Sequence, residues 1–207
     1  MAPKKQPQPP AAKAQRAPAN DGYEFSGNDE RSELMQLANK LKSPNKGKDA
    51  LVKLLKQLRT ALEALPQDVE ALGAAKEILP QQLYQHATHE RADKDVRLYS
   101  AACLVHLMRV FAPDIPYDDE ELKVLFGVLL DCWSRLADTD AATFDLCCTT
   151  LQVFADVKFY VPLLDLGDPQ LLTRTFATLL QAARPESLEA LQRPVLEVLG
   201  GMLEEEG

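Results

Sequence analysis

The stretch that decides the fold is Asp93–Tyr117, DKDVRLYSAACLVHLMRVFAPDIPY. It runs without Gly or Pro as far as Phe111, and an uninterrupted run of this apolar composition predicts one long helix. Asp93 and Asp95 stand at its start, where carboxylates can cap free N–H groups and favour the helix dipole. Two prolines, Pro113 and Pro116, then fix φ at their own positions in the short turn that follows Phe111. The stretch therefore predicts a helix that ends in a stiff corner.

Helical segments of the same kind lie on both sides of this stretch. Residues 48–65 carry leucines at helical spacing, and 120–136 and 141–160 continue the pattern. Shorter helices are expected at 29–41 and 170–183, a helix kinked or restarted at Pro80 over 69–89, and a last helix from Ser187 to Glu204. Val, Ile and Thr form no alternating runs, so strand signals are nearly absent. The chain is expected to be all-α.

Helix starts near residues 48, 93 and 141 are expected to open successive antiparallel pairs, at an interval of roughly 45 residues that matches HEAT or armadillo units. One helical pair cannot bury its apolar face alone, so neighbouring pairs stack into a continuous core. We therefore predict a HEAT/armadillo-like α-solenoid of about seven helices in antiparallel pairs. A four-helix bundle would fit the number of helices but does not require a repeated interval.

The N-terminal end differs from the rest in composition. Residues 1–20 hold five of the fourteen prolines and four basic residues without an acid, so we expect 1–27 to be a disordered tail and 28–207 to be the helical-repeat segment. With net charge −8 for the chain, the remainder carries −8 − 4 = −12. This acidic body disfavours direct DNA binding by the folded part. No apolar run approaches the ~18 residues of a membrane span.

Signatures of catalysis or of a cofactor are missing from the sequence. It has no phosphate-binding loop, no G-x-S-x-G and no H-E-x-x-H. Its three histidines and four cysteines do not show the spacing of a zinc site, and buried free thiols are the better interpretation of the cysteines. We therefore predict no enzyme activity, no metal and no cofactor.

Two groups of residues are candidates for a role beyond the core. The first group is the corner itself: Ala112, Pro113, Asp114, Ile115, Pro116 and Tyr117. It is either a rigid turn only or, as a more specific hypothesis, a peptide-docking site. A stiff turn loses little conformational entropy on binding, which favours affinity. The second group is Asp93, Asp95 and Arg97, an acid and base arrangement at a helix start that is common in HEAT repeats. We expect this group to bridge adjacent repeats.

From this corner outward the sequence resembles the N-terminal region of the Pds-five cohesin regulators. The similarity covers roughly Lys48–Glu206, through DKDVRLYSAACLVHLMRVFAPDIPY, LKVLFGVLL, LADTD and DVKFY in that order. The family pattern at the corner is Ala-Pro-Asp/Glu-Ala-Pro-Tyr, so Ile115 replaces a small residue. The stretch Phe144–Tyr160 also departs, with Cys147 and Cys148 where relatives are richer in aromatic residues.

The resemblance implies a nuclear, chromatin-associated scaffold that regulates sister-chromatid cohesion. Its implied partners are the SMC–kleisin cohesin complex, the release factor Wapl and competing antagonists, whose short motifs dock at the corner. The family's kleisin-binding surface lies mostly in later repeats. The alternatives are a generic HEAT or armadillo adaptor in transport or translation, and a helical enzyme without a recognisable site. The resemblance also implies a piece of a longer solenoid, with an exposed apolar face at its C-terminal end.

Overall fold

The computed structural model describes residues 27–43, 47–89, 92–137, 143–183 and 188–205. The first helix, α1, begins at Gly27, one residue before the expected start of the helical segment. The tail expected at residues 1–27 therefore lies, apart from Gly27, outside the described residues.

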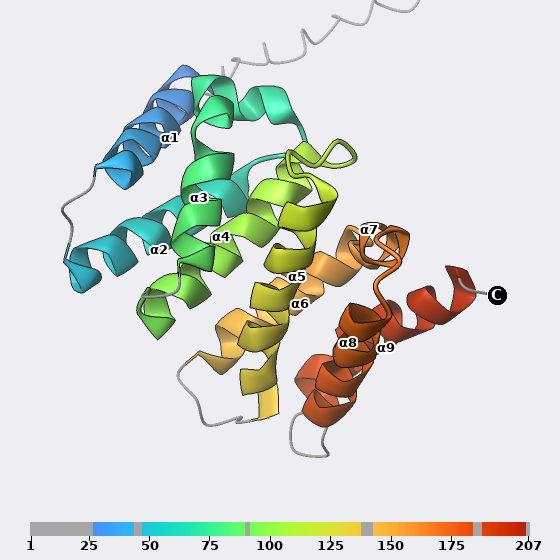
Figure 1. Ribbon diagram of the computed structural model, residues 1–207. Helices are drawn as coiled ribbons and strands as arrows, with labels where there is room; N and C mark the ends of the chain where they lie inside the picture. The colour runs from blue at the N-terminus through green and yellow to red at the C-terminus, as the bar shows by residue number, and fades with distance from the viewer. Residues whose placement is uncertain (1–26, 44–46, 90–91, 138–142, 184–187, 206–207) are drawn as a thin grey trace, which may run out of the picture.

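Helices make up the described part of the chain, which contains no strand, and they follow one another as antiparallel pairs (Figure 1). The pairs are formed by α1 with α2, α3 with α4, α5 with α6, and α8 with α9. Their bounds are α1 Gly27–Lys42, α2 Lys48–Ala64, α3 Leu79–Thr88, α4 Lys94–Phe111, α5 Asp119–Trp133, α6 Phe144–Asp156, α8 Pro169–Ala182 and α9 Leu188–Glu205. Short elements join them, namely the 3₁₀ helices η1 Val69–Glu77 and η2 Ser134–Ala137, and α7 Tyr160–Asp165.

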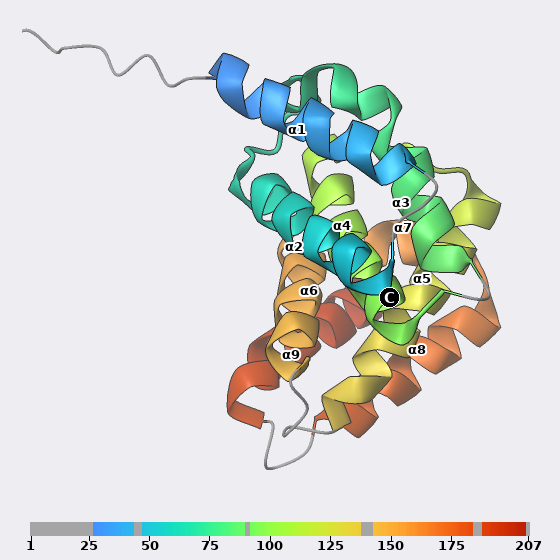
Figure 2. The ribbon, with the colours of Figure 1, turned by 90° about the vertical axis from the view of Figure 1, so that its left-hand side faces the viewer.

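The pairs stack as a solenoid, as the sequence predicts. The helices that begin at Lys48, Lys94 and Phe144 were expected to open pairs, but they are the second helices of their pairs, because α1, α3 and α5 precede and pack against them. With Leu188 of α9 they preserve the interval of roughly 45 residues. In space α2 packs on α4, α4 on α6 and α6 on α9, while α3 packs on α5 and α5 on α8. Figure 1 shows α3, α5 and α8 following one another across the front, and Figure 2 shows α2, α6 and α9 from the side.

Two of the helices expected from the sequence are interrupted in the structure. The segment expected at 69–89 breaks at Gly73, whose φ of 55° leaves the helical region, and restarts with Pro80 in the first turn of α3. The segment expected at 141–160 begins at Phe144 and breaks at Lys158, whose φ is 56°. The chain beyond this residue turns into α7, which the sequence pattern did not predict.

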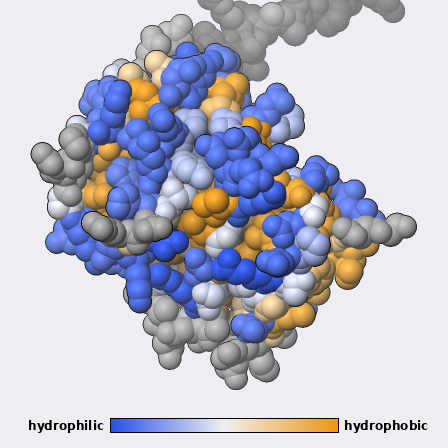
Figure 3. All heavy atoms as spheres, in the orientation of Figure 1, coloured by the Kyte–Doolittle hydropathy of each residue, from blue (hydrophilic) through white to orange (hydrophobic). Residues whose placement is uncertain are grey.

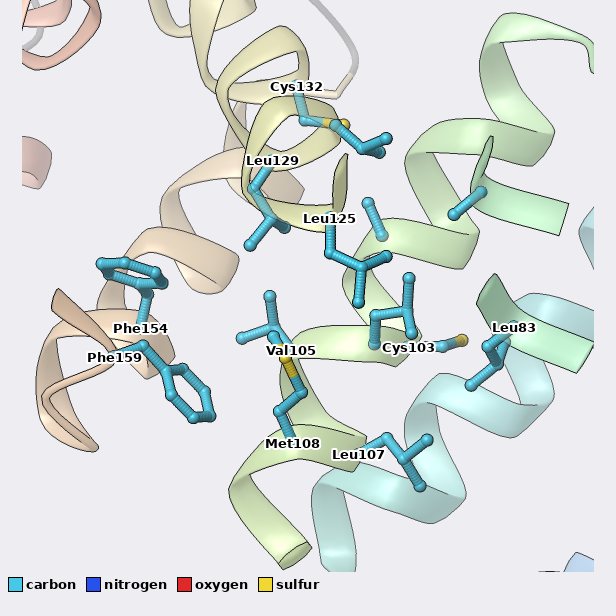
Figure 4. Close-up of a cluster of buried hydrophobic side chains, with 14 of the residues drawn as sticks. Leu83, Cys103, Val105, Leu107, Met108, Leu125, Leu129, Cys132, Phe154 and Phe159 are labelled. Atoms are coloured by element: carbon cyan, nitrogen blue, oxygen red, sulfur yellow. The ribbon is translucent and has the colours of Figure 1, made fainter. Parts of the chain in front are cut away.

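The core lies between the layers and is centred on aromatic rings. Phe154 of α6 packs edge-on against Trp133 and Phe126 of α5, with ring centroids 4.9 and 6.0 Å apart, and also contacts Phe159. Figure 4 shows how side chains of α4 and α5 meet in the interior, with Leu83 of α3 beside them. Ile115 and Tyr117, from the corner between α4 and α5, also pack against this core, so that corner is held in a defined position.

Candidate functional site

The corner between α4 and α5 is the predicted docking site, and its side chains divide into outward and inward groups. Pro113 and Asp114 are exposed at its tip. Ile115, Pro116 and Tyr117 are partly buried, and Ile115 and Tyr117 pack against the core. The corner therefore offers a proline and a carboxylate to solvent.

Tyr117 anchors the corner to the preceding pair. Its hydroxyl donates a hydrogen bond of 3.0 Å to the backbone carbonyl of Pro80 at the start of α3. Its ring lies 6.1 Å from that of Tyr84, also on α3. Burial, with a smaller contribution from Glu121, raises the pKa of Tyr117 above its usual range. The phenol is thus a neutral structural donor, and its hydroxyl is already engaged within the chain.

The turn after α2 borders the other side of the corner. Gln67 donates from Nε2 to the carbonyl of Ala112 over 3.4 Å. One turn earlier on α4, Arg109 donates from Nη2 to the carbonyls of Leu62 and Leu65, at 3.0 and 2.8 Å. These carbonyls belong to the end of α2, where a cation is favourable. The corner is consequently held between two earlier segments of the chain.

Sequence reasoning did not identify Gln67, Pro80 and Tyr84 as neighbours of the corner. They precede Ala112 and Tyr117 by 33 to 45 positions and reach them only through stacking of the pairs. The only sequence signal that could have predicted these contacts was the repeat interval, because stacked repeats bring a corner next to the preceding pair.

Carboxylates dominate the outer surface next to the corner. Asp118 and Glu121 form a capping box at the start of α5, with Asp118 accepting from the Glu121 N–H at 2.8 Å. Asp114, Asp119 and Glu120 are exposed beside them, and Glu120 pairs with Lys123 at 2.7 Å. Because like charges repel and opposite charges attract at this range, this surface favours a partner segment that carries a basic side chain.

The second predicted group lies at the opposite end of α4 from the corner. Asp93 caps α4 by accepting from the Asp95 N–H, and Lys48 of α2 contacts Asp93 and Asp95 at 3.0 and 2.8 Å. Arg97 donates to the Ala87 carbonyl at 3.3 Å and lies 3.7 Å from a carboxylate oxygen of Asp131 on α5. These polar contacts connect α4 with the pairs on either side.

The described residues contain no cluster of three or more His, Cys, Asp or Glu side chains arranged to hold a metal ion. The four cysteines are free thiols, and three of them, Cys103, Cys132 and Cys147, are buried. Within the same ranges, no helix is both long and apolar enough to cross a membrane.

Comparison with known families decides the affiliation of the fold. The model of the family described as sister chromatid cohesion protein PDS5 matches residues 49–207, which is most of the chain and includes the corner and every helix from α2 onward. The chain belongs to the PDS5 family. The resemblance to the Pds-five regulators found in the sequence is thereby confirmed.

Individual PDS5 relatives match at moderate identity. The chain is 29% identical over 171 residues to sister chromatid cohesion protein PDS5 homolog E of Arabidopsis thaliana, covering 82% of this chain and 17% of that protein. It is 26% identical over 160 residues to pds5 of Schizosaccharomyces pombe, covering 75% and 13%, and 28% identical over 163 residues to PDS5 homolog A of Homo sapiens, covering 76% and 12%. The chain thus spans less than a fifth of each of these PDS5 proteins.

A solved structure supports the same PDS5 architecture. The structure described as that of the Pds5–Scc1 complex, with implications for cohesin function, superposes with a TM-score of 0.64 at 22% identity. The match covers 80% of this chain and 25% of that one. The likeness establishes a shared helical solenoid fold.

Proposed function

We propose that the chain is a non-enzymatic scaffold that regulates cohesin on chromatin, and hence sister-chromatid cohesion. It acts in the nucleus by binding short linear motifs of the release factor Wapl and of its antagonists. Family membership supports the process, because the named relatives are sister chromatid cohesion proteins.

The observation that carries the proposal is the anchored corner. The Tyr117 hydrogen bond to Pro80 and the Gln67 contact to Ala112 fix both ends of the turn, while Pro113 and Asp114 remain exposed. A preformed recognition surface binds with less loss of conformational entropy than a mobile loop. The site residues are Ala112, Pro113, Asp114, Ile115, Pro116 and Tyr117, of which Asp114 supplies the charge and Tyr117 the support.

The docked motif has a basic residue that approaches Asp114. The acids at the start of α5 add to the same negative potential and steer a basic segment towards the corner. Ile115 is partly buried and packs against the core. The resemblance implies a small residue at this position, so we propose that the larger Ile115 side chain limits how closely the motif approaches. No bond is made or broken, and regulation follows from competition among motifs for one site.

The cohesin complex itself is the proposed larger partner. Support comes from the related structure, which is described as that of a Pds5–Scc1 complex. This chain matches a quarter of that protein. We propose that this chain docks regulatory motifs, while the resemblance implies that the family's kleisin-binding surface lies mostly in later repeats.

A titration with a Wapl-derived peptide tests the docking site. Wild type is compared with Asp114→Lys, which reverses the exposed charge, and Tyr117→Ala, which removes the anchor. Asp119→Lys serves as a matched control, because it makes the same charge reversal at an exposed residue outside the corner. We expect weaker binding by about 10-fold or more for Asp114→Lys and a smaller loss for Asp119→Lys. Equal binding by wild type, Asp114→Lys and Tyr117→Ala would remove the corner from the site.

A further inference from the structure

A groove lies along the seam between α1 and α2, the first helical pair, and holds a hollow of about 380 Å³. In Figure 2 these two helices lie one above the other. Apolar side chains from the middle of α1 and the end of α2 line the groove, with exposed polar side chains beside them: Leu34, Ala61, Ala64 and Leu65, with Glu33 and Thr60. The groove is therefore an apolar hollow with a polar edge.

The hollow exists because α2 carries small side chains where it borders α1. The side of α2 that faces the core is made of buried leucines. At the seam the side chains are Thr60, Ala61 and Ala64, and Ala64 is exposed. The buried Leu34 of α1 and Leu65, which are 1% and 7% exposed, supply the apolar lining behind them. The three small residues leave room for one more apolar side chain.

The surface around the groove is hydrophilic. Most of the outer positions of α1 are polar and exposed: Arg31, Ser32, Glu33, Gln36 and Lys40. In Figure 3 hydrophobic residues are visible along the lower right, over α8 and α9, whereas the upper left, where α1 lies, is mostly hydrophilic. An apolar hollow within such a surface is a place where an apolar side chain binds.

The sequence that leads into α1 supplies such a side chain. Residues 1–26 precede Gly27, the first residue of α1. Tyr23 and Phe25 are the aromatic residues among them, and the sequence before Tyr23 contains no Val, Ile, Leu or Phe. Large apolar side chains are thus concentrated immediately before the helix that borders the groove.

The position of Phe25 relative to α1 brings the groove within its reach. Counted from Gly27, Phe25 stands at N′, and a hydrophobic residue at N′ packs over position N4 of its helix. Position N4 is residue 30, and Leu34 follows it on the same side of the helix, about 6 Å further along the axis. Because α1 and α2 are antiparallel, the end of α2 with Ala64 lies beside the same part of α1.

We propose that the groove between α1 and α2 binds the side chain of Phe25 from the same chain. A connection this short gives an effective concentration on the order of mM, which favours the residue in cis over a second copy or a separate peptide. The bound ring closes the groove to other apolar segments and adds to the apolar contacts of the first pair. The proposal differs from the sequence-based expectation of a tail over 1–27 only in the residues next to α1.

Methyl NMR of the full chain tests this contact. In wild type we expect nuclear Overhauser cross-peaks between the ring protons of Phe25 and the methyl groups of Ala61 and Ala64. Phe25→Ser should lose these cross-peaks, and both methyl signals should shift because the ring current is gone. Tyr23→Ser is the matched control, since it removes the neighbouring aromatic ring, and it should keep them. Absence of the cross-peaks in wild type, or their loss in Tyr23→Ser, would overturn the proposal.

Chymotrypsin, which cleaves after aromatic residues, measures how often Phe25 leaves the groove. Ala64→Trp fills the hollow from α2, so cleavage after Phe25, followed by mass spectrometry, should become about 10-fold faster, in proportion to the open population. Ala50→Trp makes the same change at an exposed alanine at the start of α2 and should be cleaved as slowly as wild type. Circular dichroism establishes that both variants are folded.

Two results of the cleavage experiment would contradict the proposal. Equal rates for wild type and Ala64→Trp would mean that the groove does not hold Phe25. Protection in wild type that is lost on dilution, together with sedimentation as a dimer, would mean that the groove binds this residue from a second copy.

Discussion

The hydroxyl of Tyr117 and the carbonyl of Pro80 are joined by a hydrogen bond of 3.0 Å across 37 positions of sequence. It ties the corner that follows α4 to the first turn of α3. A partly buried neutral hydrogen bond of this kind contributes about 1 kcal/mol to stability. The bond is the most direct link between the solenoid fold and the proposed docking site.

Replacing Tyr117 by Phe removes this bond while keeping the ring. We expect the free energy of unfolding to fall by about 1 kcal/mol, measured by urea denaturation. Tyr84→Phe is the matched control, because Tyr84 contributes its ring to the contact with Tyr117 and its hydroxyl makes no hydrogen bond to the described residues. It should change stability by only a few tenths of a kcal/mol. An equal loss in both variants would show that the Tyr117 hydroxyl does not anchor the corner.

The adjacent glycines of α9 should respond to alanine in opposite directions. A Cβ at Gly201 would lie within 3.0 Å of the Tyr160 ring, whereas a Cβ at Gly200 would meet nothing within 4 Å. Tyr160 is buried, so its ring has little room to move. We expect Gly201→Ala to lower the melting temperature, at a cost of about 1–3 kcal/mol. Gly200→Ala should raise the melting temperature, because the higher helix propensity of alanine stabilises the fold by about 0.5–1 kcal/mol. The same sign for both would contradict the close packing of α9 against Tyr160.

Lys158 occupies a position that favours glycine. Its φ is 56°, and the hydrogen bonds from Lys158 N to Ala155 O and from Phe159 N to Phe154 O, each 3.0 Å, form a Schellman motif at the end of α6. A left-handed conformation costs a residue with a Cβ about 1 kcal/mol. We therefore expect Lys158→Gly to stabilise the protein by about that amount in thermal unfolding. Lys158→Ala removes the same charge but keeps the Cβ, so a similar gain in that variant would rule out the backbone as the cause.

His106 should make the stability of the chain depend on pH. It is 2% exposed, and neither of its ring nitrogens has a hydrogen-bond partner in the described structure. Burial lowers its pKa from 6.5 to about 4. Between these values the unfolded chain binds more protons than the folded one, so stability is full above about pH 6.5 and falls as pH drops towards about 4. The loss is on the order of 3 kcal/mol.

The variant His106→Leu isolates this contribution. Urea denaturation from pH 7 to pH 4 should show a shallower loss of stability in the variant than in wild type, because its carboxylates are unchanged while the buried imidazole is gone. At neutral pH the free energy of unfolding of His106→Leu should be close to that of wild type, since the substitution removes two ring nitrogens that lack hydrogen-bond partners. Parallel pH curves would mean that His106 is not the responsible group.

Much of the fold could be predicted because each helix carries its own signals. The Asp93 cap predicted α4, the leucine spacing predicted α2, and the proline after Asp168 predicted α8, each within a residue or two of its observed bounds. The repeat interval predicted that the pairs stack. The breaks at Gly73 and Lys158 were missed. A lone glycine within a helical pattern is tolerated often enough to be uninformative, and a lysine in the left-handed region has no sequence signature.

The candidate site was predictable only in part, for a similar reason. Pro113 and Pro116 mark a stiff corner by their local effect on φ. What supports that corner, namely Pro80, Tyr84 and Gln67, comes from the preceding pair and depends on how the pairs are stacked. The inward position of the Tyr117 hydroxyl could not be inferred from its place next to the exposed tip.

The central claim, that this chain is a cohesin-regulating scaffold acting through its corner, is tested most directly by co-purification with mass spectrometry. Tagged wild type and the Asp114→Lys variant are expressed in cells and recovered in parallel. The account predicts that wild type recovers SMC and kleisin subunits together with Wapl, and that Asp114→Lys is selectively depleted of Wapl. Recovery of karyopherin cargo or translation factors in place of cohesin, or equal Wapl recovery by both proteins, would contradict it.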